Sequence, residues 1–143
     1  MVGKAINRYA MIGNGDRVLV ALSGGLDSLA LLDAVTARRA RIPISYSVTA
    51  AHILVEGLEG YADAGVMEEF CRERGVEFVV RAVSGGIDFS NPDSRCFYCS
   101  WHRRKALFGL MREGGFSRLA FGHHLDDILE TLILNMTFNA RLT

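Results

Sequence analysis

Short apolar segments rich in β-branched residues alternate along this chain with segments whose apolar residues recur every three or four positions. Strict alternation of strands and helices is typical of parallel strands joined by right-handed crossovers. We therefore predict an α/β fold in three layers, a parallel sheet with helices on both faces. The expected strands cover residues 17–22, 46–53, 77–83 and 118–121, and the expected helices cover residues 4–12, 27–39, 61–74, 97–112 and 125–138.

Chain length and composition fit one folded domain over residues 1–143. Hydrophobic residues make up 50% of the chain and charged residues 22%, which excludes a mainly disordered protein. Because no apolar run approaches the ~20 residues of a membrane helix, and no signal peptide is visible, we expect a cytoplasmic protein without membrane contact. Sixteen basic residues balance sixteen acidic ones, so any contact with RNA must come from a local patch.

The expected helix over residues 97–112 follows a loop. The expected last helix, over residues 125–138, is apolar on nearly every side. Residues 84–95 contain Gly-Gly and Asn-Pro, which predicts that loop. The helix over residues 125–138 needs a covering layer. We therefore expect either that the domain continues past residue 143 with a final strand, so that this chain is truncated, or that a second copy covers the helix in a homodimer.

The segment Ser-Gly-Gly-Leu-Asp-Ser, residues 23–28, lies between the first expected strand and its helix. Free backbone N–H groups at a helix start form an anion site, and glycines let the backbone approach a phosphate closely. Ser23 and Ser28 can donate hydroxyl hydrogen bonds. The lysine of the Walker loop is absent. A plain tight turn, with Asp27 or Ser28 as the helix cap, is the alternative.

Two of the three cysteines, Cys96 and Cys99, are spaced three apart at the entry of the expected helix over residues 97–112. In a cytosolic protein this spacing favours a metal or redox site over a disulfide. A bland pair of thiols is the alternative. Basic residues 102–105 follow, either as a phosphate contact or as a solvated face. We expect Cys71 to be an inert core thiol on an apolar helix face with Val66, Met67 and Phe70.

A second polar cluster, Gly-His-His-Leu-Asp-Asp at residues 122–127, follows the fourth expected strand. If the sheet reverses its order there, this cluster lies beside the glycine turn in one ligand-binding crevice. Asp126 and Asp127 suit a magnesium ion or a helix cap. Adjacent histidines point apart, so His123 and His124 are not a zinc pair. For His52, at the end of the second expected strand, we favour a structural role over a catalytic one.

Taken together, these motifs resemble the PP-loop ATP pyrophosphatases, in which S-G-G-x-D-S follows the first strand. Within that superfamily the chain is similar to the tRNA 2-thiocytidine synthetases. The further matches are G-D-R-V at residues 15–18, C-x-x-C-S-x-x-R-R at residues 96–104 and G-H-H-x-D-D-I-L-E-T-L at residues 122–132. Leu26 departs from the family, because these synthetases usually carry lysine there.

This resemblance implies an enzyme that cleaves ATP to AMP and pyrophosphate while activating the C2 oxygen of a cytidine in the tRNA anticodon loop. Sulfur from a sulfur donor then replaces that oxygen. The implied cofactors are ATP, Mg²⁺ and a [4Fe–4S] cluster. The resemblance also assigns residues to three groups: ATP contacts at Ser23, Gly24, Gly25, Asp27, Ser28, Ala51, His52, Ile53, Gly122 and His123; magnesium and catalysis at Asp27, Asp126 and Asp127; cluster ligands at Cys96 and Cys99.

Three alternatives stay open from the sequence. In the family a third, more C-terminal cysteine completes the cluster, and this chain has none after Cys99. The cysteine pair could therefore hold zinc, share a cluster between subunits or form a simple dithiol. A different PP-loop enzyme, such as a lysidine synthetase or a small-molecule sulfur transferase, would share the ATP site without a cluster. A nucleotide-binding or metal-binding module without turnover is the third alternative.

Overall fold

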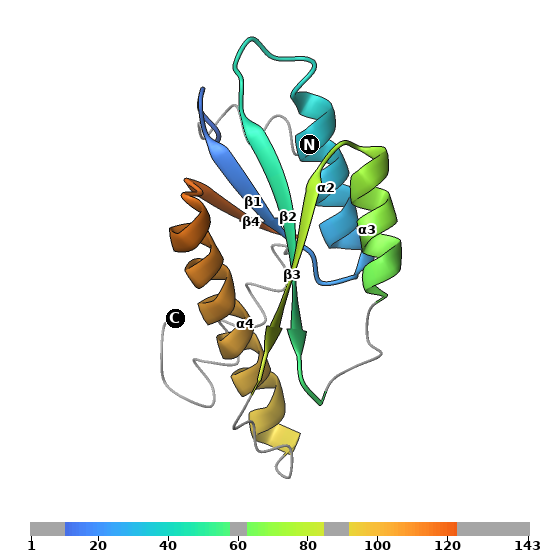
Figure 1. Cartoon of the computed structure of the whole chain (residues 1–143), viewed down its shortest axis with the longest axis vertical. Coiled ribbons are helices and arrows are strands. Elements are labelled where there is room, and N and C mark those ends of the chain that lie inside the picture. Colours follow the sequence, from blue (N-terminus) through green and yellow to red (C-terminus); the bar gives the residue numbers. More distant parts are fainter. Residues whose placement is uncertain (1–10, 58–62, 85–91, 123–143) are drawn as a thin grey trace, which may run out of the picture.

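The computed structural model describes residues 11–57, 63–84 and 92–122, with side chains in the last range from Cys99 onward. Strands and helices alternate in the predicted order (Figure 1). Most of the expected lead-in helix and all of the expected helix over residues 125–138 lie outside the described residues. The elements are β1 (Arg17–Ala21), α2 (Leu26–Arg38), β2 (Ser47–Val55), α3 (Ala64–Glu73), β3 (Glu77–Val83), α4 (Pro92–Gly114) and β4 (Arg118–Phe121).

The four described strands form one parallel sheet in the order β3-β2-β1-β4. Helices α2 and α3 cover one face of the sheet, and α4 covers the other (Figure 1). This arrangement follows from right-handed crossovers, because the chain moves in one direction from β1 to β3 and then returns across the opposite face to β4. The predicted three-layer α/β fold is confirmed.

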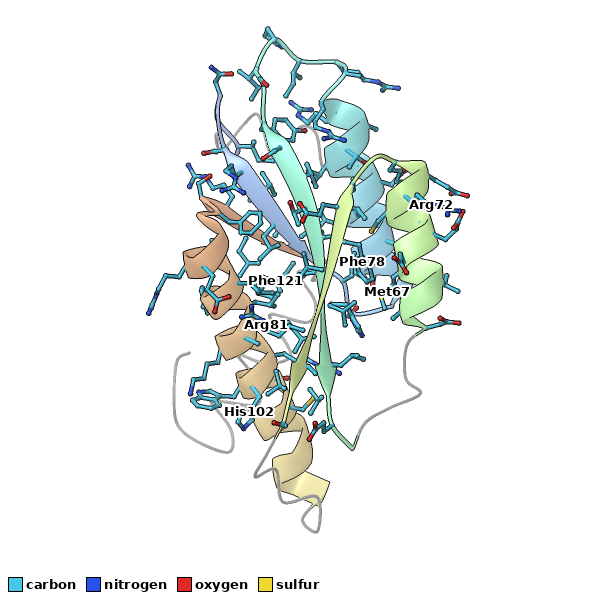
Figure 2. All side chains as sticks on the ribbon, in the orientation of Figure 1. Met67, Arg72, Phe78, Arg81, His102 and Phe121 are labelled. Atoms are coloured by element: carbon cyan, nitrogen blue, oxygen red, sulfur yellow. The ribbon has the colours of Figure 1, made fainter. Side chains whose placement is uncertain are left out.

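A buried core fills each side of the sheet because side chains alternate along the strands. In β1, Val18 and Val20 face α2 and α3, whereas Leu19 faces α4. Figure 2 shows Met67 on α3 and Phe78 on β3 between that helix and the sheet. The two cores therefore fix α2 and α4 on opposite faces of the same strands.

The prediction that Val66, Met67, Phe70 and Cys71 share an apolar face of α3 is only partly correct. Met67 and Cys71 are fully buried, which confirms the place of Cys71 in the core. This burial also raises the pKa of the Cys71 thiol. Val66, in contrast, is 60% exposed, because the buried stripe of this short helix is narrower than predicted. Gly75 follows the helix with φ of +62°, the left-handed conformation of a helix-ending glycine.

Helix α4 begins earlier than predicted. The loop expected over residues 84–95 is wrong at its end, since the helix starts at Pro92. Proline is favoured in the first turn of a helix, because its missing N–H would have no intrahelical acceptor there. In the part of the chain that the structure describes, no helix is both long and apolar enough to cross a membrane.

Candidate nucleotide site

Strands β1 and β4 end at the same level of the sheet, where β2 continues to Val55. Ala21, the last residue of β1, is in register with Ala51 of β2 on one side and with Phe121 of β4 on the other. The order of strands reverses between β1 and β4, and open α/β sheets bind ligands at such a point. Gly122 therefore follows β4 beside the glycine turn that follows β1, as the sequence predicts.

A cavity of about 270 Å³ opens where β1 and β4 end, between the sheet and α4. Its volume is near the lower end of the range for small-molecule sites. Several residues predicted to bind ATP lie in its wall, together with residues of α4 that were not predicted. The lining residues are Ala21, Leu22, Ser23, Ser28, Ala51, His52, Ile53, Ser100, Arg103, Arg104, Leu107, Phe121 and Gly122.

Two serines hold the glycine turn in place. The Ser28 hydroxyl donates to the carbonyl oxygen of Gly25 (2.9 Å) and accepts from the backbone N–H of Ser23 (3.3 Å). The two serine Oγ atoms are 3.3 Å apart. Gly24 has φ of +90°, which a residue with a Cβ rarely adopts. The turn is thus fixed by its own side chains before any ligand binds.

Neither Asp27 nor Ser28 is the N-cap of α2, so that alternative is wrong. Gly25 occupies the cap position, and no side chain caps the helix. The Gly25 N–H donates to Ser23 Oγ at 3.3 Å. Among the described residues no side chain caps the positive end of α2, and such a helix start favours anions. Asp27 is exposed in the first turn, and Leu26 is 84% exposed. Asp27, Gly24 and Gly25 belong to the turn but not to the cavity wall.

Gly122 brings the end of β4 into direct contact with the start of α2. A Cβ atom on this glycine would lie 2.8 Å from Ser28 Cα and 2.9 Å from Ser28 N. Both distances are far below van der Waals contact, so no larger residue fits without movement of the backbone. The two segments can form one compact wall only because residue 122 is glycine.

His52 ties β2 to the residue that precedes the glycine turn. Its Nδ1 lies 2.7 Å from the carbonyl oxygen of Leu22, and the side chain is buried. Since a carbonyl only accepts, Nδ1 carries the hydrogen, and Nε2 is then the acceptor in the neutral ring. His52 thus has a structural hydrogen bond, although it also lines the cavity.

The loss of this hydrogen bond should destabilise the chain. We expect His52→Leu to lower the free energy of unfolding by about 1–3 kcal/mol, because it leaves the buried Leu22 carbonyl without its donor. His52→Asn is the matched control, since its amide can donate from nearly the same position. Urea unfolding followed by circular dichroism measures both variants. Equal losses in the two would mean that the hydrogen bond does not support the turn.

Helix α4 contributes a side of the cavity that sequence reasoning missed. Ser100, Arg103, Arg104 and Leu107 recur at helical spacing and so share one face of the helix. From the sequence, the basic run at residues 102–105 indicates a phosphate contact or a solvated face, and nothing in it indicates a wall of the ATP site. Leu107 is the sequence signal for this arrangement. Its apolar side chain packs against the sheet, and it lies on the same face of α4 as Arg103 and Arg104, so that face is directed toward the sheet.

The cysteine pair lies within α4 and not at its first turn, because the helix begins at Pro92. Cys99 is a buried free thiol. Cys96 is in the helix, but its side chain lies outside the described ones. Among the described residues, no group of three or more histidine, cysteine, aspartate or glutamate side chains could hold a metal ion. His123, Asp126 and Asp127 also lie outside the described residues.

Comparison with known proteins agrees with this geometry. The family model of the PP-loop domain matches residues 3–143. The chain belongs to the PP-loop family. We call the glycine turn, residues 23–28, the PP-loop. This turn, the uncapped start of α2 and the cavity all lie where the order of strands reverses.

Similar sequences carry one functional name. A tRNA-cytidine(32) 2-sulfurtransferase of Geotalea uraniireducens is 40% identical over 141 residues, which cover 96% of this chain and 55% of that protein. A protein of the same name from Alkalilimnicola ehrlichii is 38% identical over 146 residues, 99% of this chain and 46% of that protein. The chain thus spans about half the length of these curated relatives.

A solved structure shares the fold of this PP-loop domain. It is a U34-tRNA thiolase from Methanococcus maripaludis, determined with its [4Fe–4S] cluster. The TM-score is 0.73 at 30% sequence identity, and the alignment covers 88% of this chain and 44% of that one.

Proposed function

We propose that this chain is the ATP-using domain of an enzyme that replaces the C2 oxygen of a tRNA cytidine with sulfur. The observation that carries the proposal is the cavity at the reversal of strand order, whose wall combines the serines of the PP-loop with Gly122 and two arginines. The names of the similar proteins supply the substrate class, because those proteins are tRNA-cytidine(32) 2-sulfurtransferases.

The described residues fit ATP. The uncapped start of α2 offers backbone N–H donors to phosphate oxygens. The Ser23 and Ser28 hydroxyls line the cavity and hold the turn in the shape that presents these donors, through their own hydrogen bonds. Within β2, level with the end of β1 and just beyond it, Ala51, His52 and Ile53 supply a largely apolar wall that suits the adenine. In the proposed division of roles, Gly24 and Gly25 give the backbone access to the phosphates, and Asp27 faces the magnesium ion from the rim.

The residues of the second polar cluster complete the proposed site. Gly122 and His123 shape the pocket, and Asp126 and Asp127 bind near ATP and its magnesium. Carboxylates are the ligands that magnesium prefers in proteins. ATP bound with magnesium would supply the adenylate that activates the C2 oxygen, with pyrophosphate as the leaving group. In this proposal the chain's own residues hold the phosphates, and α4 forms one wall of the cavity.

Cys96 and Cys99 are the proposed ligands of a [4Fe–4S] cluster, and the similar thiolase from Methanococcus maripaludis carries such a cluster. Because Cys96 and Cys99 are three residues apart, they lie on adjacent turns of α4, as joint ligation requires. The described residues do not by themselves fit a cluster, because they contain no group of three ligands. The proposed roles of the described residues do not depend on a cluster. Other ligands would have to complete the cluster site.

The partners in this proposal are the anticodon loop of a tRNA and a sulfur donor. We propose a cytoplasmic location for this reaction. A homodimer would cover the apolar segment over residues 125–138 that the sequence analysis singled out.

The proposal predicts AMP formation that depends on the identity of one nucleotide. We would incubate the chain with ATP, Mg²⁺, sulfide and a tRNA transcript that carries cytidine at position 32, the position in the name of the similar proteins. We expect AMP release and a 2-thiocytidine product by nucleoside mass spectrometry. The matched control is the same transcript with uridine at that position, which should give neither product.

Other outcomes would decide against the proposal. AMP release that needs free lysine, with lysidine as the product, would make the chain a lysidine synthetase. Equal AMP release with both transcripts would exclude cytidine as the acceptor. ATP binding with no AMP under any condition would favour a nucleotide-binding module.

A further inference from the structure

We propose that Arg103, assisted by Arg104, binds the phosphate chain of ATP, so that α4 supplies positive charge that the PP-loop lacks. This inference rests on the proposed function only in taking ATP as the ligand of the cavity. It assigns a phosphate-binding role to a helix that follows β3, on the face of the sheet opposite to α2.

The charge on the cavity wall is the first argument. Residues 22–28 contain no lysine or arginine, and their one ionisable group is the carboxylate of Asp27. Among the described residues that line the cavity, Arg103 and Arg104 are the two with a permanent positive charge, and none is acidic. A triphosphate carries several negative charges, and backbone N–H groups alone contribute only partial charges. The arginines therefore make this wall complementary to a triphosphate.

The hydrogen bonding of Arg103 is the second argument. Its Nε is buried and has no hydrogen-bond partner among the described residues. Buried donors in native proteins nearly always have an acceptor, so an unpaired one calls for an explanation. An oxyanion in the adjacent cavity would supply the acceptor. The planar guanidinium also matches the paired oxygens of a phosphate, which makes arginine a common phosphate ligand.

The position of Arg103 on α4 is the third argument. Leu107, four residues later, is 4% exposed and belongs to the core between α4 and the sheet. Residues four apart share a helix face, so the packing of Leu107 holds the backbone of Arg103 toward the strand ends. Ser23 and Ser28 belong to the same cavity wall. The start of α2 and the guanidinium of Arg103 can thus act on one phosphate chain.

The test compares the affinities of ATP and adenosine, with no tRNA present. We expect Arg103→Met to weaken ATP binding about tenfold or more, because a charge-assisted contact to phosphate is lost. Adenosine binding should stay within twofold of its original value. Arg103→Lys should retain part of the ATP affinity, since it keeps the charge but not the fork of donors. Titration calorimetry measures the dissociation constants.

Two further variants make the test specific. Arg112→Met removes an arginine from the exposed last turn of the same helix, away from the cavity wall, and should leave ATP affinity unchanged. Leu26→Lys adds a positive charge beside the turn, at a position that is 84% exposed. Combined with Arg103→Met, it should recover several-fold of the lost ATP affinity, which a merely misfolded variant could not show.

The outcomes separate this inference from the proposed function. Unchanged ATP binding in Arg103→Met, or an equal loss for ATP and adenosine, would overturn the role of Arg103. The expected ATP-specific loss together with no thiolation of tRNA would leave the inference standing while the proposed reaction fails. A wild-type chain that binds neither ATP nor adenosine would overturn the nucleotide site and this inference together.

Discussion

Gly122→Ala should damage both folding and nucleotide binding, although it adds a single methyl group. The new Cβ would lie 2.8 Å from Ser28 Cα, 2.9 Å from Ser28 N and 3.0 Å from the carbonyl carbon of Asp27. All three are backbone atoms, so no side chain can rotate away. The end of β4 or the first turn of α2 must move instead. Overpacking of this kind costs about 1–3 kcal/mol of stability.

The same shift should lower ATP affinity by about tenfold or more, because the displaced turn carries the proposed phosphate donors. Gly109→Ala is the matched control. Among the described residues outside its own helix, the new Cβ would have Arg81 Nη1 alone within 4 Å, at 3.9 Å, and alanine is the better helix former. Urea unfolding and ATP titration measure both variants. If Gly122→Ala behaves like Gly109→Ala, the end of β4 does not pack against the PP-loop in solution.

The sheet and its helices could be predicted because their signals are local. Buried parallel strands are short apolar runs, and the helices between them have the period of an amphipathic helix. The bounds of β3 and β4 agree with the prediction to the residue. The start of α4 could not be found this way, because Asn-Pro is typical of a loop and Pro92 is also well suited to a first helical turn.

The candidate site could be predicted where its residues lie in the strands or in the segments that come after them. Ser23, Ser28 and Gly122 could be found because parallel strands bring their carboxyl ends to the same edge. The contribution of Arg103 depends on which face of α4 turns toward the strand ends, and that is decided by tertiary packing through Leu107. The absence of a cap on α2 likewise depends on the bonding of Ser28 to Gly25, which spacing does not reveal.

The cysteine pair shows a further limit of local patterns. The spacing of Cys96 and Cys99 indicates joint ligation of a metal, but a metal site also needs ligands that are distant in the chain. Cys71, the remaining cysteine, is fully buried in the core between the sheet and the α2/α3 layer. Cys99 belongs to α4 on the opposite face. The fold therefore places the sheet between Cys71 and Cys99, which excludes Cys71 as the missing third ligand.

The second large effect should come from the core beneath the PP-loop helix. Leu32 on α2 has no exposed surface and packs in the cluster that contains Val18 and Val20 of β1. We expect Leu32→Ala to lower the free energy of unfolding by about 2–5 kcal/mol, because it removes buried methyl groups and leaves a cavity. Such a loss is a large share of the roughly 5–15 kcal/mol that stabilises a typical domain.

Leu26→Ala is the matched control for this prediction, because it makes the same change in the same helix at a side chain that is 84% exposed. A surface substitution of this kind should change stability by no more than about 0.5 kcal/mol. Urea unfolding with tryptophan fluorescence and circular dichroism measures both variants, and ATP titration shows whether the loop is affected. Because Leu32 lies one turn after Ser28, its packing holds the first turn of α2 against β1. Leu32→Ala should therefore weaken ATP binding as well, whereas a loss of stability with unchanged affinity would mean that the PP-loop keeps its shape through its own hydrogen bonds alone.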